Sequence, residues 1–414
     1  MSFLIITMNT YLKRYLRISF INLCIVALLG SIMRYKIAYS LPFVDQKHLL
    51  HAHSHFAFVG WISQTLMVLL VQYLSKNSGE DKFIPYRKIL IANLISAYGM
   101  LLSFPVQGYG AVSITFSTLS EFVFYYFSFC YWRDLNKLKV QSVIHQWFKV
   151  GLFLGVLSSV GTFSLAYMMV TKVVHQNWYL AAIYFYLHFQ YNGWFFFACI
   201  GLLYSILPEN IRNTRELKNV FLLFAFASVP AYFLSVLWLP LPGWLFIIII
   251  ISSIAQVVAW LMMLNVFYTK NEQIAQNVSL TGKWLMALSG LALTVKLCLQ
   301  LGSNIPALSK LAFGFRPIVI AYLHLVLLGV ITLFLLGYIF SSPTYKIQKI
   351  TFYGIIVFVA GIILNEVVLM IQGVASFSYT SIPYINVVLL GVALILFFGI
   401  LLIAISRFKE AKQK

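Results

Sequence analysis

One pattern of chemistry-bearing residues recurs in the chain, a histidine followed five residues later by a glycine. The three pairs are His55 and Gly60, His188 and Gly193, and His324 and Gly329. Neutral imidazole is the commonest metal ligand among side chains. Two imidazoles that face one another across a helical bundle suit the two axial positions of a haem iron. The pattern therefore predicts a metal or haem site assembled from separate helices.

More histidines precede the first of these pairs. His48, His51 and His55 stand at positions i, i+3 and i+7 and share one helix face, whereas His53 points elsewhere. The rival ligands are therefore His51 or His55 on one helix face and His53 on another. The spacing does not decide between them. The i, i+4 spacing of His51 and His55 also suits chelation of a non-haem metal such as copper, with His188 completing the set.

The composition determines where such a site would lie. The 414 residues are 61% hydrophobic and only 9% charged, with a mean hydropathy of +0.90, whereas soluble domains carry roughly 25% charged residues. A soluble domain of this composition would expose large apolar patches to water, so a soluble enzyme and a nucleic-acid binder are excluded. The net charge of +19 is explained by basic cytoplasmic loops. The four cysteines lack the spacing of a zinc site or a disulfide framework.

The hydropathy predicts an all-α, polytopic membrane protein with membrane lipid around it. A membrane helix needs roughly 20 mainly apolar residues, and the chain holds twelve such stretches in a single membrane domain, 1–414. The predicted spans are about residues 17–38, 48–74, 88–106, 111–132, 148–170, 178–207, 219–239, 242–268, 282–302, 315–340, 349–371 and 384–406. Trp132, Trp147 and Trp178 near span ends are typical of an interfacial aromatic belt.

The basic residues predict the orientation of these spans. Most of the 29 Lys and Arg residues fall in segments that lie inside if the N-terminus is cytoplasmic. The positive-inside rule then places both termini in the cytoplasm of a bacterial-type inner (plasma) membrane. The second, sixth and tenth spans would all run inward. His55, His188 and His324 would then lie at one depth, on the order of 10–15 Å below the outer surface.

These stretches resemble the catalytic subunit (subunit I) of haem–copper oxidases and their nitric oxide reductase relatives. Residues 30–34 (GSIMR), Pro42 and the histidine cluster are similar to the end of that family's first helix and the start of its second. Residues 188–208 (HFQYNGWFFFACIGLLYSILP) are similar to its sixth helix, whose histidine binds copper. Residues 322–329 (YLHLVLLG) are similar to its tenth helix, which carries His-x-His.

The resemblance implies twelve spans, a low-spin b-type haem held by His324 and by His55 or a neighbour, and copper at His188. Two departures stand against a complete oxygen-reducing centre. The seventh predicted span contains no histidine, and Tyr322 stands where the family's high-spin haem ligand would be. Because tyrosine can also ligate haem iron, Tyr322 is a candidate replacement. The resemblance thus implies a diverged member in which oxidoreductase activity is an open question.

Several charges lie inside or at the ends of the predicted spans. Glu121, Lys296 and Glu366 stand in apolar runs, where an ionisable group marks a proton path, a quinol pocket or a structural pair such as Lys296 with Glu366. Arg34 and Arg316 stand at outer span ends. They would either clamp haem propionates, since guanidinium binds carboxylates bidentately, or extend to the interface.

We therefore expect a haem-binding membrane redox protein for electron transport or for chemistry on a small gas, oxygen or nitric oxide. A quinol or cytochrome electron donor and further subunits are its expected partners. The alternatives are a copper-binding membrane protein and a proton-coupled transporter. A transporter favours matched broken helices in two halves of the chain, and the sequence shows no such pair.

Overall fold

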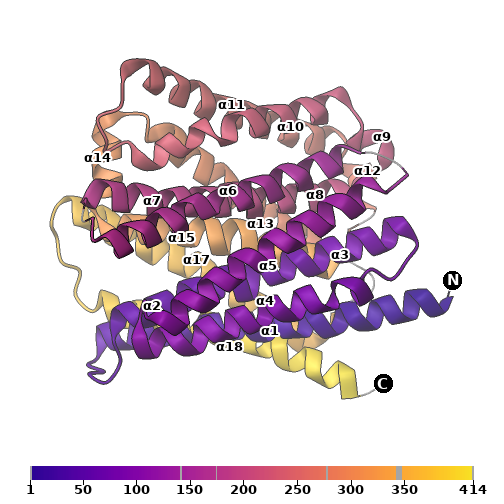
Figure 1. Ribbon diagram of the computed structural model, residues 1–414, viewed down its shortest axis with the longest axis horizontal. Coiled ribbons are helices and arrows are strands. Elements are labelled where there is room, and N and C mark those ends of the chain that lie inside the picture. The colour runs from indigo at the N-terminus through magenta and orange to yellow at the C-terminus, as the bar shows by residue number, and fades with distance from the viewer. Residues whose placement is uncertain (1, 140–141, 174, 277, 342–346, 413–414) are drawn as a thin grey trace. The chain divides into compact units, whose positions relative to one another are not determined.

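The computed structural model describes residues 2–139, 142–173, 175–276, 278–341 and 347–412, and Figure 1 shows the course of the chain. Every regular element within these ranges is helical. The apolar runs explain this, because a chain segment in lipid has to satisfy its own backbone hydrogen bonds, and a helix does so within the segment. The prediction of an all-α chain is confirmed for the described residues.

Nine helices of the described chain are long and apolar enough to cross a membrane, so the chain is a multi-pass membrane protein. A tenth candidate is a bent pair, α10 (Arg215–Ser228) and η3 (Pro230–Val236). The remaining two predicted spans are also helical. They are α5 (Ala111–Asn136) and the run of α7 (Gln176–His188), η2 (Phe189–Phe195) and α8 (Phe196–Ile206). Both are rich in Ser, Tyr, Asn or Gln, so the count of twelve and the placement of the termini stay predictions.

The chain divides into two compact units. Unit 1 holds the first four and the last two predicted spans. Its elements are α1 (Ser2–Ala38), α2 (Gln46–His55), η1 (Phe56–Ser63), α3 (Gln64–Ser78), α4 (Phe83–Gln107), α5, α17 (Lys349–Phe377) and α18 (Ile385–Lys412). The single membrane domain stays a prediction.

Unit 2 holds the fifth to tenth predicted spans. Its elements are α6 (Val143–Thr171), α7, η2, α8, α9 (Glu209–Arg212), α10, η3, α11 (Gly243–Thr269), α12 (Asn271–Ala275), α13 (Leu280–Gly302), α14 (Pro306–Gly314), α15 (Arg316–His324), η4 (Leu325–Thr332) and α16 (Leu333–Ser341).

The second predicted span is the centre of unit 1. It comprises α2, η1 and α3, and 94% of its most apolar window is buried. It packs against α1 and α4, while α18 packs against both α1 and α17. Figure 1 shows α1 and α18 side by side and antiparallel, so the two ends of the chain lie at the same end of unit 1.

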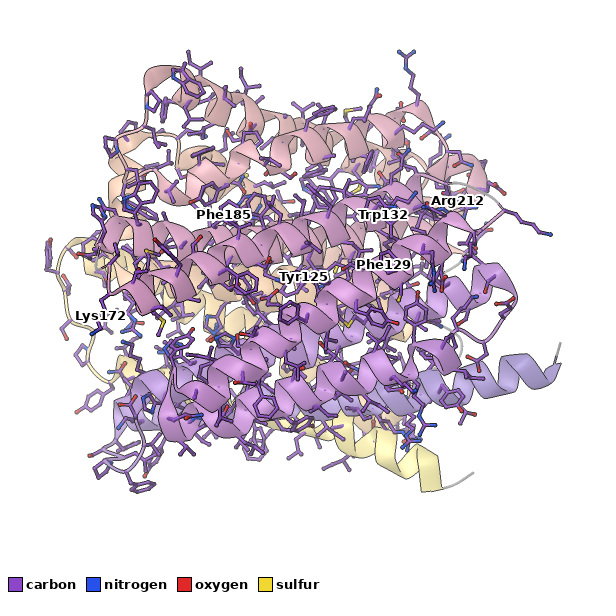
Figure 2. The ribbon with its side chains drawn as sticks, in the orientation of Figure 1. Tyr125, Phe129, Trp132, Lys172, Phe185 and Arg212 are labelled. Carbon is purple, nitrogen blue, oxygen red and sulfur yellow. The ribbon has the colours of Figure 1, made fainter. Side chains whose placement is uncertain are left out.

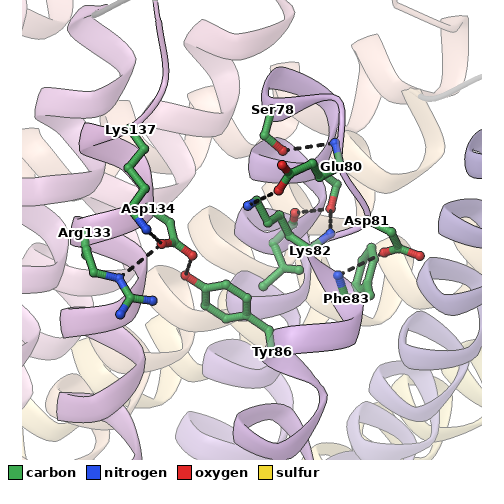
Figure 3. Close-up of polar contacts among 11 residues, drawn as sticks. Ser78, Glu80, Asp81, Lys82, Phe83, Tyr86, Arg133, Asp134 and Lys137 are labelled. Carbon is green, nitrogen blue, oxygen red and sulfur yellow. Dashed lines mark hydrogen bonds and ion pairs between the residues drawn. The ribbon is translucent and has the colours of Figure 1, made fainter.

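A buried carboxylate ties α4 to the end of α5 (Figure 3). The Tyr86 hydroxyl donates to Asp134 over 3.2 Å, and Arg133 and Lys137 donate to the other carboxylate oxygen over 3.3 and 3.4 Å. The hydrogen bond from Arg133 raises the pKa of the guanidinium. Because Asp134 is buried, these partners offset the free energy of removing its charge from water.

Two of the three tryptophans predicted to lie in an interfacial aromatic belt are exposed, so the belt stays a prediction there, and it is wrong for the third. Trp132, labelled in Figure 2 on α5 beside Phe129, is exposed, and so is Trp178. Trp147 is fully buried near the start of α6, where it contacts Phe197, Tyr204 and other aromatic rings. A helix end that packs inside its own unit buries a residue type that otherwise favours the membrane interface.

The contact between α17 and α18 generates a test of this fold. A methyl group at Gly399 would lie 2.5 Å from the backbone nitrogen of Phe358, whereas nothing lies within 4 Å of such a group at Gly391 on the same helix. We expect Gly399→Ala to lower the free energy of unfolding by about 1–3 kcal/mol through overpacking. The midpoint of thermal unfolding in detergent measures this. Gly391→Ala is the matched control, and equal midpoints for the two variants would contradict the packing.

Candidate functional site

The three histidines of the repeated pattern share one local structure. Each is the last residue of an α-helical segment and is followed at once by a π-helical one: His55 by η1, His188 by η2 and His324 by η4. A π-helical turn joins residues i and i+5, which is the spacing from each histidine to its glycine. Because π-helical turns are rare and frequently occur at functional sites, their occurrence after all three histidines marks these positions as special.

The glycines of the pattern have a packing role. A methyl group at Gly193 would lie 2.8 Å from the Leu154 side chain of α6, and one at Gly329 would lie 3.1 Å from Ala292 of α13. These two glycines therefore allow close approach of another helix. In unit 2 the segments η2 and η4 also contact each other, so His188 and His324 begin neighbouring π-helical segments.

His324 is held by its own helix. Its Nδ1 lies 2.8 Å from the Ile320 carbonyl oxygen, an arrangement in which Nδ1–H donates and Nε2 is the nitrogen that would bind a metal. The burial of the residues changes sharply along this span. None of the residues of α15 is buried, whereas all of α16 except Tyr338 is buried. The stretch that carries His324 is therefore the part of the span that protein side chains cover least.

His53 has the same arrangement in unit 1. Its Nδ1 lies 3.1 Å from the Val26 carbonyl oxygen of α1, and a methyl group at Gly30 would lie 3.4 Å from the His53 ring. Arg34 follows Gly30 by one turn of α1 and is half-buried, and no described residue forms a hydrogen bond or ion pair with it. Val26, Gly30 and Arg34 thus lie along one face of α1, and the His53 ring of α2 packs against the first two.

His51 and His55 form an aromatic cluster between α2 and the α4–α5 turn. The His55 ring stacks on Phe104 with 4.6 Å between ring centroids, and its Nε2 lies 3.2 Å from the Tyr109 hydroxyl. His51 meets the Tyr109 ring edge-on at 4.5 Å, and its Nε2 is buried with no hydrogen-bond partner. His55 is thus held through the nitrogen that a metal would use, and His51 is not.

The histidine cluster is positioned by a helix cap. Asp45 accepts hydrogen bonds from the backbone N–H groups of Lys47 and His48, each over 2.8 Å, at the start of α2. The bond from His48 holds the pKa of the Asp45 carboxyl below its usual value. The stabilisation of the helix start is therefore present above the ordinary carboxyl pKa and is lost as the pH falls through the lowered one.

His188 is engaged by protein groups at both ring nitrogens. Nε2–H donates to the Ser228 carbonyl over 2.8 Å, and Nδ1 accepts from the Asn192 amide over 3.2 Å. The Ser228 carbonyl is available because the seventh predicted span bends by 49° between α10 and η3. The Tyr232 N–H, which would bond to Ser228 in a regular α-helix, donates to the Val229 carbonyl over 3.1 Å instead. Ligation of copper by His188 stays a prediction, and the metal would have to replace one of these bonds.

The remaining predicted residues occupy separate positions. In unit 2 the Tyr322 ring meets Tyr191 of η2 edge-on at 6.5 Å, and Arg316 is exposed at the start of α15. In unit 1 Glu121 is buried on α5, and Glu366 accepts a hydrogen bond from Asn365 over 3.2 Å. The pairing of Lys296 with Glu366 stays a prediction, because the two residues belong to different units.

The geometry gives no support to a non-haem metal centre. Across the described ranges, no group of three or more His, Cys, Asp or Glu side chains is placed to hold a metal ion. The four cysteines are unpaired as well, with Cys130 and Cys199 buried in the packing, as expected for residues in apolar runs.

No model of a protein family and no curated protein sequence matches the chain. The resemblance to the haem–copper oxidase subunit therefore stays a prediction, and the function has to be argued from the histidines themselves.

Several contacts of the histidines escape inspection of the sequence alone. The partners Val26 and Tyr109 come from other helices, and only the fold reveals them. Two other features leave a signal in the sequence. Asn192 stands four residues after His188, on the same helix face. Pro230 interrupts an apolar run, which predicts a bend there.

The contact of His188 with the bent span generates a second test. His188→Phe keeps most of the ring volume and removes the donor to Ser228, so a buried carbonyl loses its partner. We expect the free energy of unfolding to fall by about 1–3 kcal/mol. Thermal unfolding in detergent measures this, with His175→Phe at the exposed start of α7 as the control. Equal stability of His188→Phe and the unmodified protein would show that this hydrogen bond does not stabilise the bend.

Proposed function

We propose that the chain is a haem-binding membrane redox protein that carries one low-spin b-type haem between two histidines. The carrying observation is the environment of His324. Its Nδ1 is held by a backbone carbonyl, and it is the last residue of a helical stretch with no buried residue, whereas α16, beyond η4, is buried except at Tyr338. A polar, ionisable side chain in a membrane span is costly and marks a candidate functional site.

The second ligand in this proposal is His53 of unit 1, chosen by its own local contacts, whereas His324 belongs to unit 2. Like His324, it is oriented by a backbone carbonyl at Nδ1, which is the usual outer contact of a metal-bound histidine and fixes the ring's tautomer and direction. His51, whose buried Nε2 has no partner, is the rival. His55 ranks third because Tyr109 and Phe104 already engage its ring.

Arg34 supports the choice of His53. A haem carries two propionate carboxylates, and a guanidinium binds carboxylates in a two-pronged geometry. Arg34 stands on the same face of α1 as the groups beside His53, half-buried and without a partner among the described residues. Arg316 at the start of α15 is the corresponding candidate on the side of His324.

The chemistry that a bis-histidine haem supplies when bound is one-electron transfer. The chain's own contribution is to hold both imidazoles in fixed tautomers on rigid spans and to keep water away from them with apolar surroundings. The proposed setting is a bacterial-type inner membrane, with a quinol or cytochrome as electron donor and with partner subunits. The small gas would be oxygen or nitric oxide. The proposal does not include catalytic conversion of that gas, since His188 already bonds to protein groups.

A proton-coupled transporter is the second candidate, and the bend between α10 and η3 favours it. Broken helices mark transport sites in many transporter folds. Here the bend is bonded to His188, and transport folds need a matching break in a second half of the chain. We therefore place the transporter second.

The haem proposal is tested by the absorption spectrum of the detergent-purified protein. We expect a Soret band and a sharp reduced α-band, and loss of that low-spin spectrum in His324→Ala and in His53→Ala, because each variant removes an axial ligand. His175→Ala and His188→Phe should keep both the spectrum and the haem content.

The outcomes separate the candidates. An unchanged spectrum in His324→Ala refutes the ligand assignment, and an unchanged spectrum in His53→Ala with loss in His51→Ala transfers the second ligand to His51. Bound copper by elemental analysis with no Soret band supports the metal-binding alternative. Neither signal, with intact folding, refutes both and leaves the transporter.

A third variant tests the propionate contact. Arg34→Gln removes the charge but keeps a hydrogen-bonding side chain, so we expect haem content to fall while any remaining haem keeps its low-spin spectrum. Lys36→Gln on the same helix is the matched control, because Lys36 already donates to the Leu41 carbonyl. Unchanged haem content in Arg34→Gln would contradict a propionate partner at Arg34.

A further inference from the structure

Unit 2 contains a buried cation that the proposed haem site does not use. Lys296 stands in the second half of α13, with only 5% of its surface exposed. No described residue forms a hydrogen bond or ion pair with it. The three acidic residues of unit 2 are Glu209, Glu216 and Glu272, and all are exposed in or beside short segments away from the middle of α13. An unpaired ammonium inside a membrane protein requires another partner.

A row of polar side chains leads from Lys296 to one end of α13. Gln300 and Asn304 follow it at i+4 and i+8. Gln300 donates to Gln256 of α11 over 2.9 Å, and Asn304 donates to Ser253 of α11 over 2.8 Å. Lys296 and Gln300 are buried, whereas Asn304 is half-buried, so the row becomes more accessible toward the end of the helix.

The unmet hydrogen-bonding capacity along this row points to water. The side-chain oxygens of Gln300 and Asn304 are both buried and have no donor. Each needs a donor, and the Lys296 ammonium needs acceptors. Water supplies both and bridges groups that are too far apart for direct contact. An anion would satisfy Lys296 but would face these two carbonyl oxygens unfavourably.

The opposite direction along α13 is closed. A methyl group at Gly282 would lie 3.0 Å from the Gly337 carbonyl oxygen, and Ala292, one turn before Lys296, packs against Gly329. Ser289 donates to the Val330 carbonyl over 2.7 Å. The first half of α13 is therefore in close contact with η4 and α16, and the polar row continues only toward Asn304.

We propose that α11 and α13 form a half-channel that admits water from the Asn304 end as far as Lys296. The ammonium at its closed end exchanges protons with that water: Lys296 releases a proton to a water molecule and takes one back. The groups that face Lys296 include His188, which interacts with it electrostatically. The half-channel is independent of haem, and by the predicted orientation of the spans it opens to the outer side.

Cysteine accessibility to a charged, membrane-impermeant methanethiosulfonate reagent tests the half-channel. The native Cys298 is a built-in control, because it stands on α13 between Lys296 and Gln300 but is exposed on the face that lipid would cover. We expect Gln300→Cys to react at least about tenfold faster than Cys298, because a thiol forms its reactive thiolate only where water reaches it. Asn304→Cys should react faster still.

The direction of entry is tested in right-side-out and inverted vesicles. Gln300→Cys and Lys296→Cys should react from the side on which Asn304→Cys reacts, and adding Gln300→Leu should slow the reaction of Lys296→Cys at least about tenfold. A rate at Gln300→Cys equal to that of Cys298, or entry from the other side, overturns the proposal. Gln300→Cys keeps Lys296, so its rate decides the matter even if Lys296→Cys does not fold.

Discussion

The apolar core of a lipid bilayer offers no hydrogen-bond partners, and the contacts of the buried polar groups described above follow from that constraint. Backbone groups in the apolar core of a membrane have to be satisfied within the protein. Where a helix is regular, the helix does this alone. Where it bends, a side chain has to supply the missing bond, as His188 does for the Ser228 carbonyl. The histidines are therefore best understood by what each ring nitrogen contacts.

The contacts of the ring nitrogens distinguish histidines that have the same pattern in the sequence. His55, His188 and His324 share the same spacing to a glycine and the same transition into a π-helical segment. His188 bonds to protein at both nitrogens, His55 is clamped by Tyr109 and Phe104, and the Nδ1 of His324 lies against a carbonyl of its own helix. One local structure thus occurs with three different sets of contacts.

Much of the architecture was predictable from hydropathy, because the length and apolar content of a span are local properties. All twelve predicted ranges fall on helices, although only nine described helices meet the length and composition of a membrane crossing by themselves. The π-helical segments were not predictable, because an i to i+5 turn has no distinct composition. The burial of Trp147 was also missed, since it depends on rings from α8 and α10. The preference for His53 in the proposal rests on the carbonyl of Val26, which another helix supplies and the sequence alone does not reveal.

The π-helical segments also constrain how the chain can change. A π-helical turn accommodates about one residue more than the α-helical turn it replaces. Inserting or deleting one residue in a regular α-helix rotates everything beyond it by about 100°. A π-helical turn takes up a surplus residue locally, so the faces that pack in α3, α8 and α16 keep their direction. Deleting one residue within η1, η2 or η4 would return the turn to α geometry and leave those faces in place, whereas the same deletion in the regular helix on either side would turn them away from their partners.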